Sequence, residues 1–278
     1  MDWGARDDIN HDIWNCLEDC AFKDGIGSWQ RASGQRPLPD LVGPRAAAAH
    51  GITFVGPSYP RPDDTPGFNL RFDWRRAGAA SYTEYANLLG NAAFGVESHQ
   101  YFKWIADTSE AAGVDLEHVV VTNVVKCSIL KGESLKQAKS QLSASDLAPF
   151  ALRCLPYLRS RLASPGTPRL VVTLGTPPLQ YTLEALIRLY QHSERVRRHN
   201  YEGQVLGVVP GPNFAQQLKL AAVVGHMYLT VGEYVVLPFY HPVGTWERSR
   251  REAAVAFLQR LRQFVEEERA GQAWVGRS

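Results

Sequence analysis

Four cysteines are the residues of this chain whose type and spacing point most directly to chemistry. They are Cys16, Cys20, Cys127 and Cys154. Cys16 and Cys20 stand four residues apart, so on one helix they would share a face and could bind one centre together. Structural disulfides are disfavoured in a reducing compartment, so an even set of cysteines there indicates either a metal site or buried free thiols.

A second group of reactive or polar side chains stands within or just after short apolar runs. Asn123 lies inside one run, Ser58 follows another, and His241 follows a third and precedes a proline. An imidazole can donate to developing negative charge, and an amide offers both a donor and an acceptor. Each also has a structural interpretation, since a lone histidine is often structural and Asn123 can simply brace a sheet.

The apolar runs themselves predict the fold. Four β-branched runs without polar alternation are expected to be buried parallel strands, at 52–55, 119–125, 170–175 and 234–240. Segments of helical length lie around them, at 11–22, 82–94, 98–112, 137–162, 179–192 and 247–268. This alternation predicts an α/β fold, a three-layer α/β/α arrangement with a central, mostly parallel four-stranded sheet. Ligands of such sheets bind beyond the carboxyl ends of the strands, which here carry GPSYP, NVVKC, GTPP and HPVG.

Composition is that of an ordinary globular protein. Of 278 residues, 45% are hydrophobic and 21% are charged, and the formal net charge is +2. Because the sequence has no long apolar run and no secretory signal, we expect a cytoplasmic protein without membrane spans. Arginine clusters within 71–76, 195–198 and 248–251 can contact phosphates, although each can also be solvated helix surface. No obligate protein partner is evident.

Four segments in chain order resemble motifs of the uracil-DNA glycosylase superfamily, most closely its iron–sulfur branch. They are VTNVVKC at 121–127, RCLPYL at 153–158, LVVTLGTPPLQ at 170–180 and FYHPVG at 239–244. Each alone is weak, but all four in the right order are a specific match. The resemblance implies one domain over 1–278, with an insertion at about 181–229. It also implies a DNA glycosylase that hydrolyses the N-glycosidic bond of an aberrant or modified base and leaves an abasic site.

The resemblance assigns the four cysteines to an iron–sulfur cluster, [4Fe–4S]. Family members carry two cysteines near the amino end, one after the strand at 119–125 and one in the following helix. The chain departs in having three residues, not two, between Cys16 and Cys20, and a longer gap before Cys154. Tetrahedral zinc could use the same thiolates. We expect the centre to be structural and to tie the amino-terminal helix to the rest of the domain.

The resemblance also implies which residues bind the base. His241 matches the histidine that donates a hydrogen bond to a base carbonyl as the bond breaks, and Asn123 matches the asparagine that reads the base edge. Aromatic rings sandwich a flipped base, and the candidates are Phe72, Phe68 and Tyr59, each of which could equally belong to the core.

Contacts to DNA are expected just after the histidine motif. The family uses this segment to wedge into the duplex, and Trp246 could fill the gap left by the extruded base. Arg248 and Arg251 would then hold phosphates.

The first motif departs from the family pattern. Pro57 stands where the iron–sulfur branch commonly has glutamate, and Ser58 where other branches use aspartate. Asp63 and Asp64 could position the attacking water if their loop folds back, or they could be solvated turn residues. The altered motif suggests a base other than plain uracil, such as another deaminated base or a bulky phage cytosine, glucosylated hydroxymethylcytosine. The alternatives are a DNA-binding member without catalysis and an α/β enzyme acting on free nucleosides or nucleotides.

Overall fold

The structure is a computed structural model. It describes residues 3, 8–18, 20, 26–28, 37–47, 50–58, 82–95, 100–127, 129–131, 144–191, 195–209, 220, 223–242 and 248–271.

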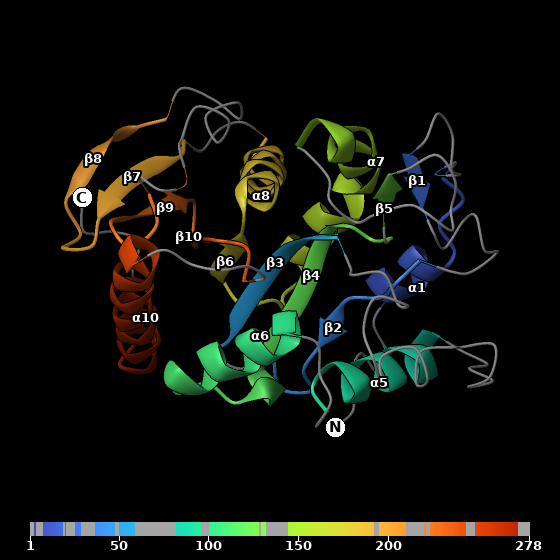
Figure 1. Cartoon of the computed structure of the whole chain (residues 1–278), viewed down its shortest axis with the longest axis horizontal. Helices are drawn as coiled ribbons and strands as arrows, with labels where there is room; N and C mark the ends of the chain where they lie inside the picture. The colour runs from blue at the N-terminus through green and yellow to red at the C-terminus, as the bar shows by residue number, and fades with distance from the viewer. Residues whose placement is uncertain are drawn as a thin grey trace.

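One mixed sheet of eight strands forms the centre of the described part of the chain, in the order β2-β4-β3-β6-β10-β9-β7-β8 (Figure 1). Its strands are β2 (Leu41–Val42), β3 (Ile52–Ser58), β4 (Val119–Val125), β6 (Leu170–Leu174), β7 (Arg197–Asn200), β8 (Val205–Val208), β9 (Met227–Val231) and β10 (Tyr234–Phe239). The neighbours β4, β3, β6 and β10 run parallel. Each of the other four strands pairs antiparallel with its neighbours in the sheet. The predicted strands are thus the parallel centre of a sheet that is wider than the four strands expected.

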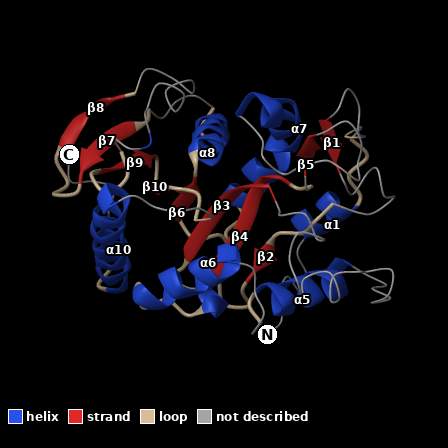
Figure 2. Cartoon of the chain, viewed as in Figure 1, coloured by secondary structure: helices blue, strands red, loops and turns tan. Residues whose placement is uncertain are grey.

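Helices cover both faces of this sheet (Figure 2). They are α1 (Asp8–Trp14), α5 (Tyr82–Ala93), α6 (Gln100–Ala111), α7 (Ala144–Ala163), α8 (Thr176–Leu189), α10 (Arg248–Arg269) and the 3₁₀ helix η2 (Leu116–His118). Helices α5, α6 and α10 share a core with Phe54 and Val172, whereas α7 and α8 share one with Val55 and Val171. Adjacent strand residues therefore enter opposite cores, which explains the unbroken apolar runs and confirms the α/β fold.

The first helix is shorter than the expected span of 11–22. Helix α1 ends at Trp14. The Asn15 side-chain amide donates to the His11 carbonyl oxygen at 3.0 Å, and the Cys16 amide donates to Ile13 in a tight last turn. Such local bonds compete with helix continuation. The expectation that Cys16 and Cys20 share a helix face is therefore wrong, because both follow the helix.

The insertion expected at about 181–229 contributes to the same sheet. It contains the end of α8, the antiparallel pair β7 and β8, and the start of β9. A further two-stranded ribbon pairs β1 (Ile26–Ser28) with β5 (Ile129–Lys131). Within the described ranges, none of the helices combines the length and apolarity that crossing a membrane requires.

Candidate active site and metal centre

A cavity of about 650 Å³ opens beyond the carboxyl ends of β3, β6 and β10. Pro57 and Ser58 border it from β3, residues 174–177 from the turn between β6 and α8, and Tyr240 and His241 from the end of β10. Because parallel strands end at one edge of a sheet, three distant segments meet there. Three of the four strand-end segments singled out in the sequence therefore border one cavity.

His241 lies at the mouth of this cavity. It is exposed, stands two residues after the end of β10 at Phe239 and lines the cavity wall. Its imidazole ring stacks on the Tyr101 ring of α6, with centroids 5.9 Å apart and planes 24° apart. Tyr101 is itself buried, and burial raises the pKa of its hydroxyl. The imidazole is thus oriented by a fixed aromatic ring while one side of it remains accessible.

Asn123 is fully buried in β4, beside Gly56 of β3. Neither its side-chain oxygen nor its nitrogen has a hydrogen-bond partner among the described residues. A buried polar group without a partner costs about 1–3 kcal/mol, so such a residue needs an explanation. Its oxygen and the Tyr101 hydroxyl both approach Gly56 so closely that a Cβ there would overlap with each. Asn123 therefore lies close to Gly56, as Tyr101 does, and it is not among the described residues that line the cavity.

The end of β3 brings no acidic group to the cavity. Ser58 is half-buried and lines the wall, next to Pro57. No carboxylate is found among the described residues that line the cavity. Asp63 and Asp64, the candidates for positioning water, lie outside the described residues.

Other predicted site residues divide between the described and the undescribed parts of the chain. Tyr59, Phe68, Phe72 and Trp246 lie outside the described residues, as does the Arg248 side chain. Arg251 is exposed on the first turn of α10.

Sequence reasoning missed several residues that shape the cavity. Leu147 of α7 and Leu220 provide apolar wall, and Tyr101 supports the imidazole. The GTPP segment was predicted to matter by its place after a strand and within a motif of the resemblance, but no role was predicted for Thr176 or Pro177. Helical residues such as Leu147 and Tyr101 carry no motif, because only tertiary packing brings them here.

The four cysteines gather in a second region. Cys127 follows β4, Cys154 lies in α7, and Cys16 and Cys20 lie in the segment after α1; all four are buried free thiols. Burial raises the pKa of Cys127, and negative charge on any of the other three sulfurs would raise it further. Burial likewise raises the pKa of Cys154, to about 11. The four thiols are therefore close enough to interact electrostatically.

Each of the four sulfur atoms has a hydrogen-bond donor beside it. The Arg153 guanidinium donates to Cys20 at 3.9 Å, the Ser28 hydroxyl to Cys127, the Lys126 backbone amide to Cys154, and the Tyr157 hydroxyl to Cys16. Neutral buried thiols behave largely as small apolar groups, whereas metal-bound thiolates accept such bonds from surrounding residues. By their number, burial and donors, the thiols suit a four-thiolate metal centre.

The thiols do not form a ready coordination sphere. Within the described ranges, no three His, Cys, Asp or Glu side chains stand at the spacing that a bound metal ion requires. Binding would therefore have to draw the sulfurs inward. Because Cys16 and Cys20 belong to no helix or strand, their segment can adjust without breaking regular structure.

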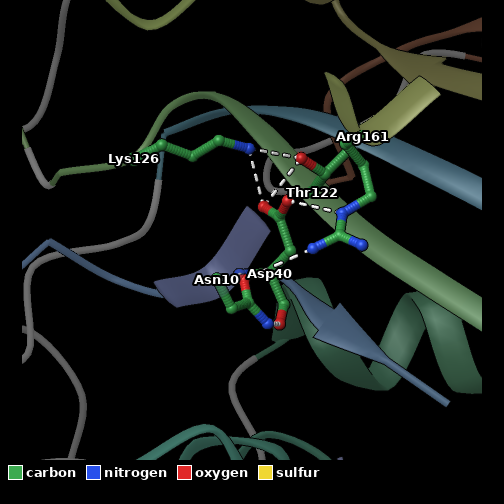
Figure 3. Close-up of polar contacts among 5 residues, drawn as sticks. All are labelled: Asn10, Asp40, Thr122, Lys126 and Arg161. Carbon is green, nitrogen blue, oxygen red and sulfur yellow. Dashed lines mark hydrogen bonds and ion pairs between the residues drawn. The ribbon is translucent and has the colours of Figure 1, made fainter. Parts of the chain in front are cut away.

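A buried ion cluster surrounds Asp40 (Figure 3). Its Lys126 side chain is close enough to Cys154 for their charges to interact. Asp40 accepts hydrogen bonds from Lys126 at 2.6 Å and from Arg161 at 2.9 Å, and also from Thr122 at 2.8 Å. Burial by itself would raise the pKa of Asp40, but the two cations outweigh it and the pKa lies below its usual range. One carboxylate thus faces two basic side chains, and one of these, Lys126, immediately precedes Cys127.

Comparison with known protein families gives one match. Residues 42–264 match the family described as the uracil DNA glycosylase superfamily. This span includes the parallel strands, the described cavity residues, Cys127 and Cys154, but not Cys16 or Cys20. No curated protein matches the chain.

Proposed function

The chain belongs to the uracil-DNA glycosylase superfamily, whose members are generally DNA glycosylases, and we propose that it hydrolyses the N-glycosidic bond of a flipped-out base in DNA. The products are the free base and an abasic site. The observation that carries this proposal is the position of His241, which faces a cavity beyond the carboxyl ends of the parallel strands. This is the edge at which α/β sheets bind ligands.

His241 is the residue we propose for stabilising the leaving base. When the bond between C1′ and the base nitrogen breaks, its electron pair passes to the base and negative charge develops on a ring carbonyl oxygen. An imidazole N–H donating to that oxygen acts where the charge forms. Water then adds to the oxocarbenium-like sugar at C1′ and loses a proton, and the base anion takes up a proton in balance, which gives the free base and the abasic site. The Tyr101 ring would hold the imidazole in position.

Asn123 is the residue we propose for reading the base. A residue that merely braced the sheet would use its amide in hydrogen bonds, yet Asn123 has no partner among the described residues. Its amide can offer one donor and one acceptor to a Watson–Crick edge. Asn123 is not among the described residues that line the cavity, so this role requires the site to open further when a base enters.

We propose Ser58, Asp63 and Asp64 as the groups that position the attacking water. Ser58 lines the cavity. Asp63 and Asp64 follow it in the sequence, outside the described residues. An oxocarbenium-like transition state asks little of its nucleophile, so a strong base is unnecessary.

The base itself is proposed to be of the uracil class or a bulkier modified cytosine. Pro57 and the leucines of the wall make this side of the cavity apolar, and no described lining residue is acidic. Such a wall tolerates a bulky substituent better than a charged one.

The first prediction tests this function with duplexes that contain uracil, hypoxanthine or glucosylated hydroxymethylcytosine. Alkali cleaves the strand at each abasic site, so cut strands report glycosylase activity. His241→Ala should slow release of the preferred base by roughly ten- to a thousandfold, because one electrostatic donor is lost. His226→Ala, at an exposed turn, is the matched control and should keep wild-type turnover. Unchanged turnover in His241→Ala would overturn the mechanism.

A catalytically inactive DNA-binding protein is the second candidate. Pro57 at the first motif and the lack of a carboxylate on the described cavity wall favour it. Intact strands for every substrate after alkali, with gel-shift binding retained, would support this candidate. Substrate affinity that hardly changes with salt would instead favour an enzyme of free nucleosides, since binding to a phosphate backbone falls steeply with salt.

The cysteines are proposed to hold a structural [4Fe–4S] cluster, with zinc as the lesser alternative. Support comes from four buried thiols and the donor beside each sulfur. Iron and acid-labile sulfide in the purified protein, with a brown colour, would agree with the cluster, and one zinc per chain would indicate the alternative. A metal-free protein with full activity would show both to be wrong.

A further inference from the structure

Helix α7 contacts three of the four cysteine positions. It carries Cys154, and on either side of that residue lie Arg153 and Tyr157. The Arg153 guanidinium donates to the Cys20 sulfur at 3.9 Å. The Tyr157 hydroxyl lies beside the Cys16 sulfur, and the pKa of Tyr157 is raised by burial and by its hydrogen bond with that sulfur. Residues four apart lie on one face of a helix, so both donors point from α7 toward the same segment.

The segment that carries Cys16 and Cys20 has little structure of its own to fix these sulfurs. Helix α1 ends before it, at Trp14. The Cys20 carbonyl accepts a bond from Ser28, which holds the backbone but not the sulfur. The side chains of α7 are therefore among the groups that define where the two sulfurs lie relative to Cys154.

We propose that Arg153 and Tyr157 are positioning residues that hold the Cys20 and Cys16 sulfurs against α7 and donate to them as metal-bound thiolates. The inference rests on the proposed metal centre and extends it, since it assigns a role to residues that bind no metal. Groups that hydrogen-bond the ligands of a metal commonly govern its affinity. They also govern reduction potential, because a donor to sulfur withdraws negative charge from the centre.

The second prediction compares metal loss from purified, metal-loaded variants. Arg153→Gln and Tyr157→Phe should each lose metal to excess EDTA about tenfold faster than the wild type, in line with loss of a residue that supports a metal ligand. If the metal is an iron–sulfur cluster, Arg153→Gln should also lower its reduction potential. Arg159→Gln removes an exposed arginine from the same helix and should match the wild type in both measurements.

The outcomes separate this inference from the metal centre itself. Wild-type protein without iron or zinc would refute the centre, and the inference with it. Metal-loaded wild type with unchanged loss rates in both variants would refute the positioning role alone. Tyr157→Phe removes a single oxygen atom, so a folding failure cannot mask its result. If the protein holds zinc, the rate of zinc release is the quantity compared between the variants and the wild type.

Discussion

Gly56 is the residue on which the geometry of the candidate active site depends most closely. It lies in β3 directly before Pro57 and Ser58, and a Cβ at this position would overlap with the Asn123 oxygen and the Tyr101 hydroxyl. Tyr101 in turn stacks on His241. The absence of a side chain at Gly56 thus allows Asn123, Tyr101 and His241 to pack together.

The third prediction concerns Gly56→Ala. The added methyl group must displace Asn123 or Tyr101, and a misplacement of about 1 Å in an active site can cost about a hundredfold in rate. We therefore expect a fall in single-turnover base release of that order, with a loss of about 1–3 kcal/mol in unfolding free energy from overpacking.

Gly166→Ala is the matched control for this substitution. A Cβ at Gly166 would lie 3.7 Å from Ala47, which is ordinary contact, and the residue is not among those that line the described cavity. It should change neither rate nor stability measurably. Full activity in Gly56→Ala would mean that Asn123 and Tyr101 need not keep their positions.

Individual site residues could be predicted from the sequence where they follow a predicted strand, because the end of that strand determines their position. His241 follows an apolar run and precedes a proline, so its place at the sheet edge followed from the fold. Tyr101 could not be predicted, because it is one of several aromatic residues in a helix and only packing brings it to His241. Nor could the sequence show that Asn123 would be fully buried without a hydrogen-bond partner among the described residues.

At the scale of elements, the ion cluster around Asp40 connects parts of the chain far apart in sequence (Figure 3). Asn10 of α1 exchanges two hydrogen bonds with the Asp40 backbone, at 2.7 and 2.9 Å. Lys126 follows β4, and Arg161 belongs to α7. The carboxylate thus joins the amino-terminal helix, the sheet and the helix that carries Cys154.

The fourth prediction is that Asp40→Asn strongly destabilises the protein. The substitution keeps the size of the side chain but leaves two buried cations without a carboxylate, which typically costs about 3–5 kcal/mol. Urea unfolding would measure the loss. Glu184→Gln breaks the surface pair with Arg188 and should cost less than about 1 kcal/mol. A loss below about 1 kcal/mol in Asp40→Asn would show that Lys126 and Arg161 find other partners.

Elements were predictable where one physical pattern dominated. Strands buried on both faces have continuous β-branched runs, and β3, β4, β6 and β10 were found for that reason. Strands β7 and β8 were not, because Arg197–Asn200 is polar and Val205–Val208 is short and largely exposed at the sheet edge. The sequence predicted a longer α1 than the structure has. It did not show that the Asn15 side chain would donate to the His11 carbonyl oxygen and so compete with continuation of the helix.

Across the whole molecule, the carboxyl ends and the amino ends of the parallel strands differ in chemistry. The cavity lies at the carboxyl edge, whereas His50 and His118 precede β3 and β4 at the amino edge. Glu268, near the end of α10, also lies at the amino ends. Its carboxylate accepts a hydrogen bond from the His50 backbone amide. Burial raises the pKa of Glu268 to about 7 despite that bond. Nearby, burial lowers the pKa of His50, as do the charges of Arg269 and His118.

The fifth prediction follows from this raised pKa. The folded protein holds the Glu268 proton more tightly than the unfolded chain, whose pKa is near 4.5, so stability should be lost as pH rises from about 4.5 through about 7. Glu268→Gln resembles the protonated side chain. It should match the wild type at pH 4.5 and exceed it by about 1 kcal/mol at pH 8, after allowance for solvent screening of a partly exposed group. Urea unfolding at a series of pH values measures the difference.

Glu266→Gln, which removes the exposed partner of Arg262, is the control on the same helix and should follow the wild-type pH profile. Base release by Glu268→Gln should also equal that of the wild type at every pH, because the substitution lies at the edge of the sheet opposite the cavity. A stability difference that is constant from pH 4.5 to 8 would show that the carboxyl does not titrate as proposed. A change in base release with stability intact would show instead that the two edges are coupled through the strands between them.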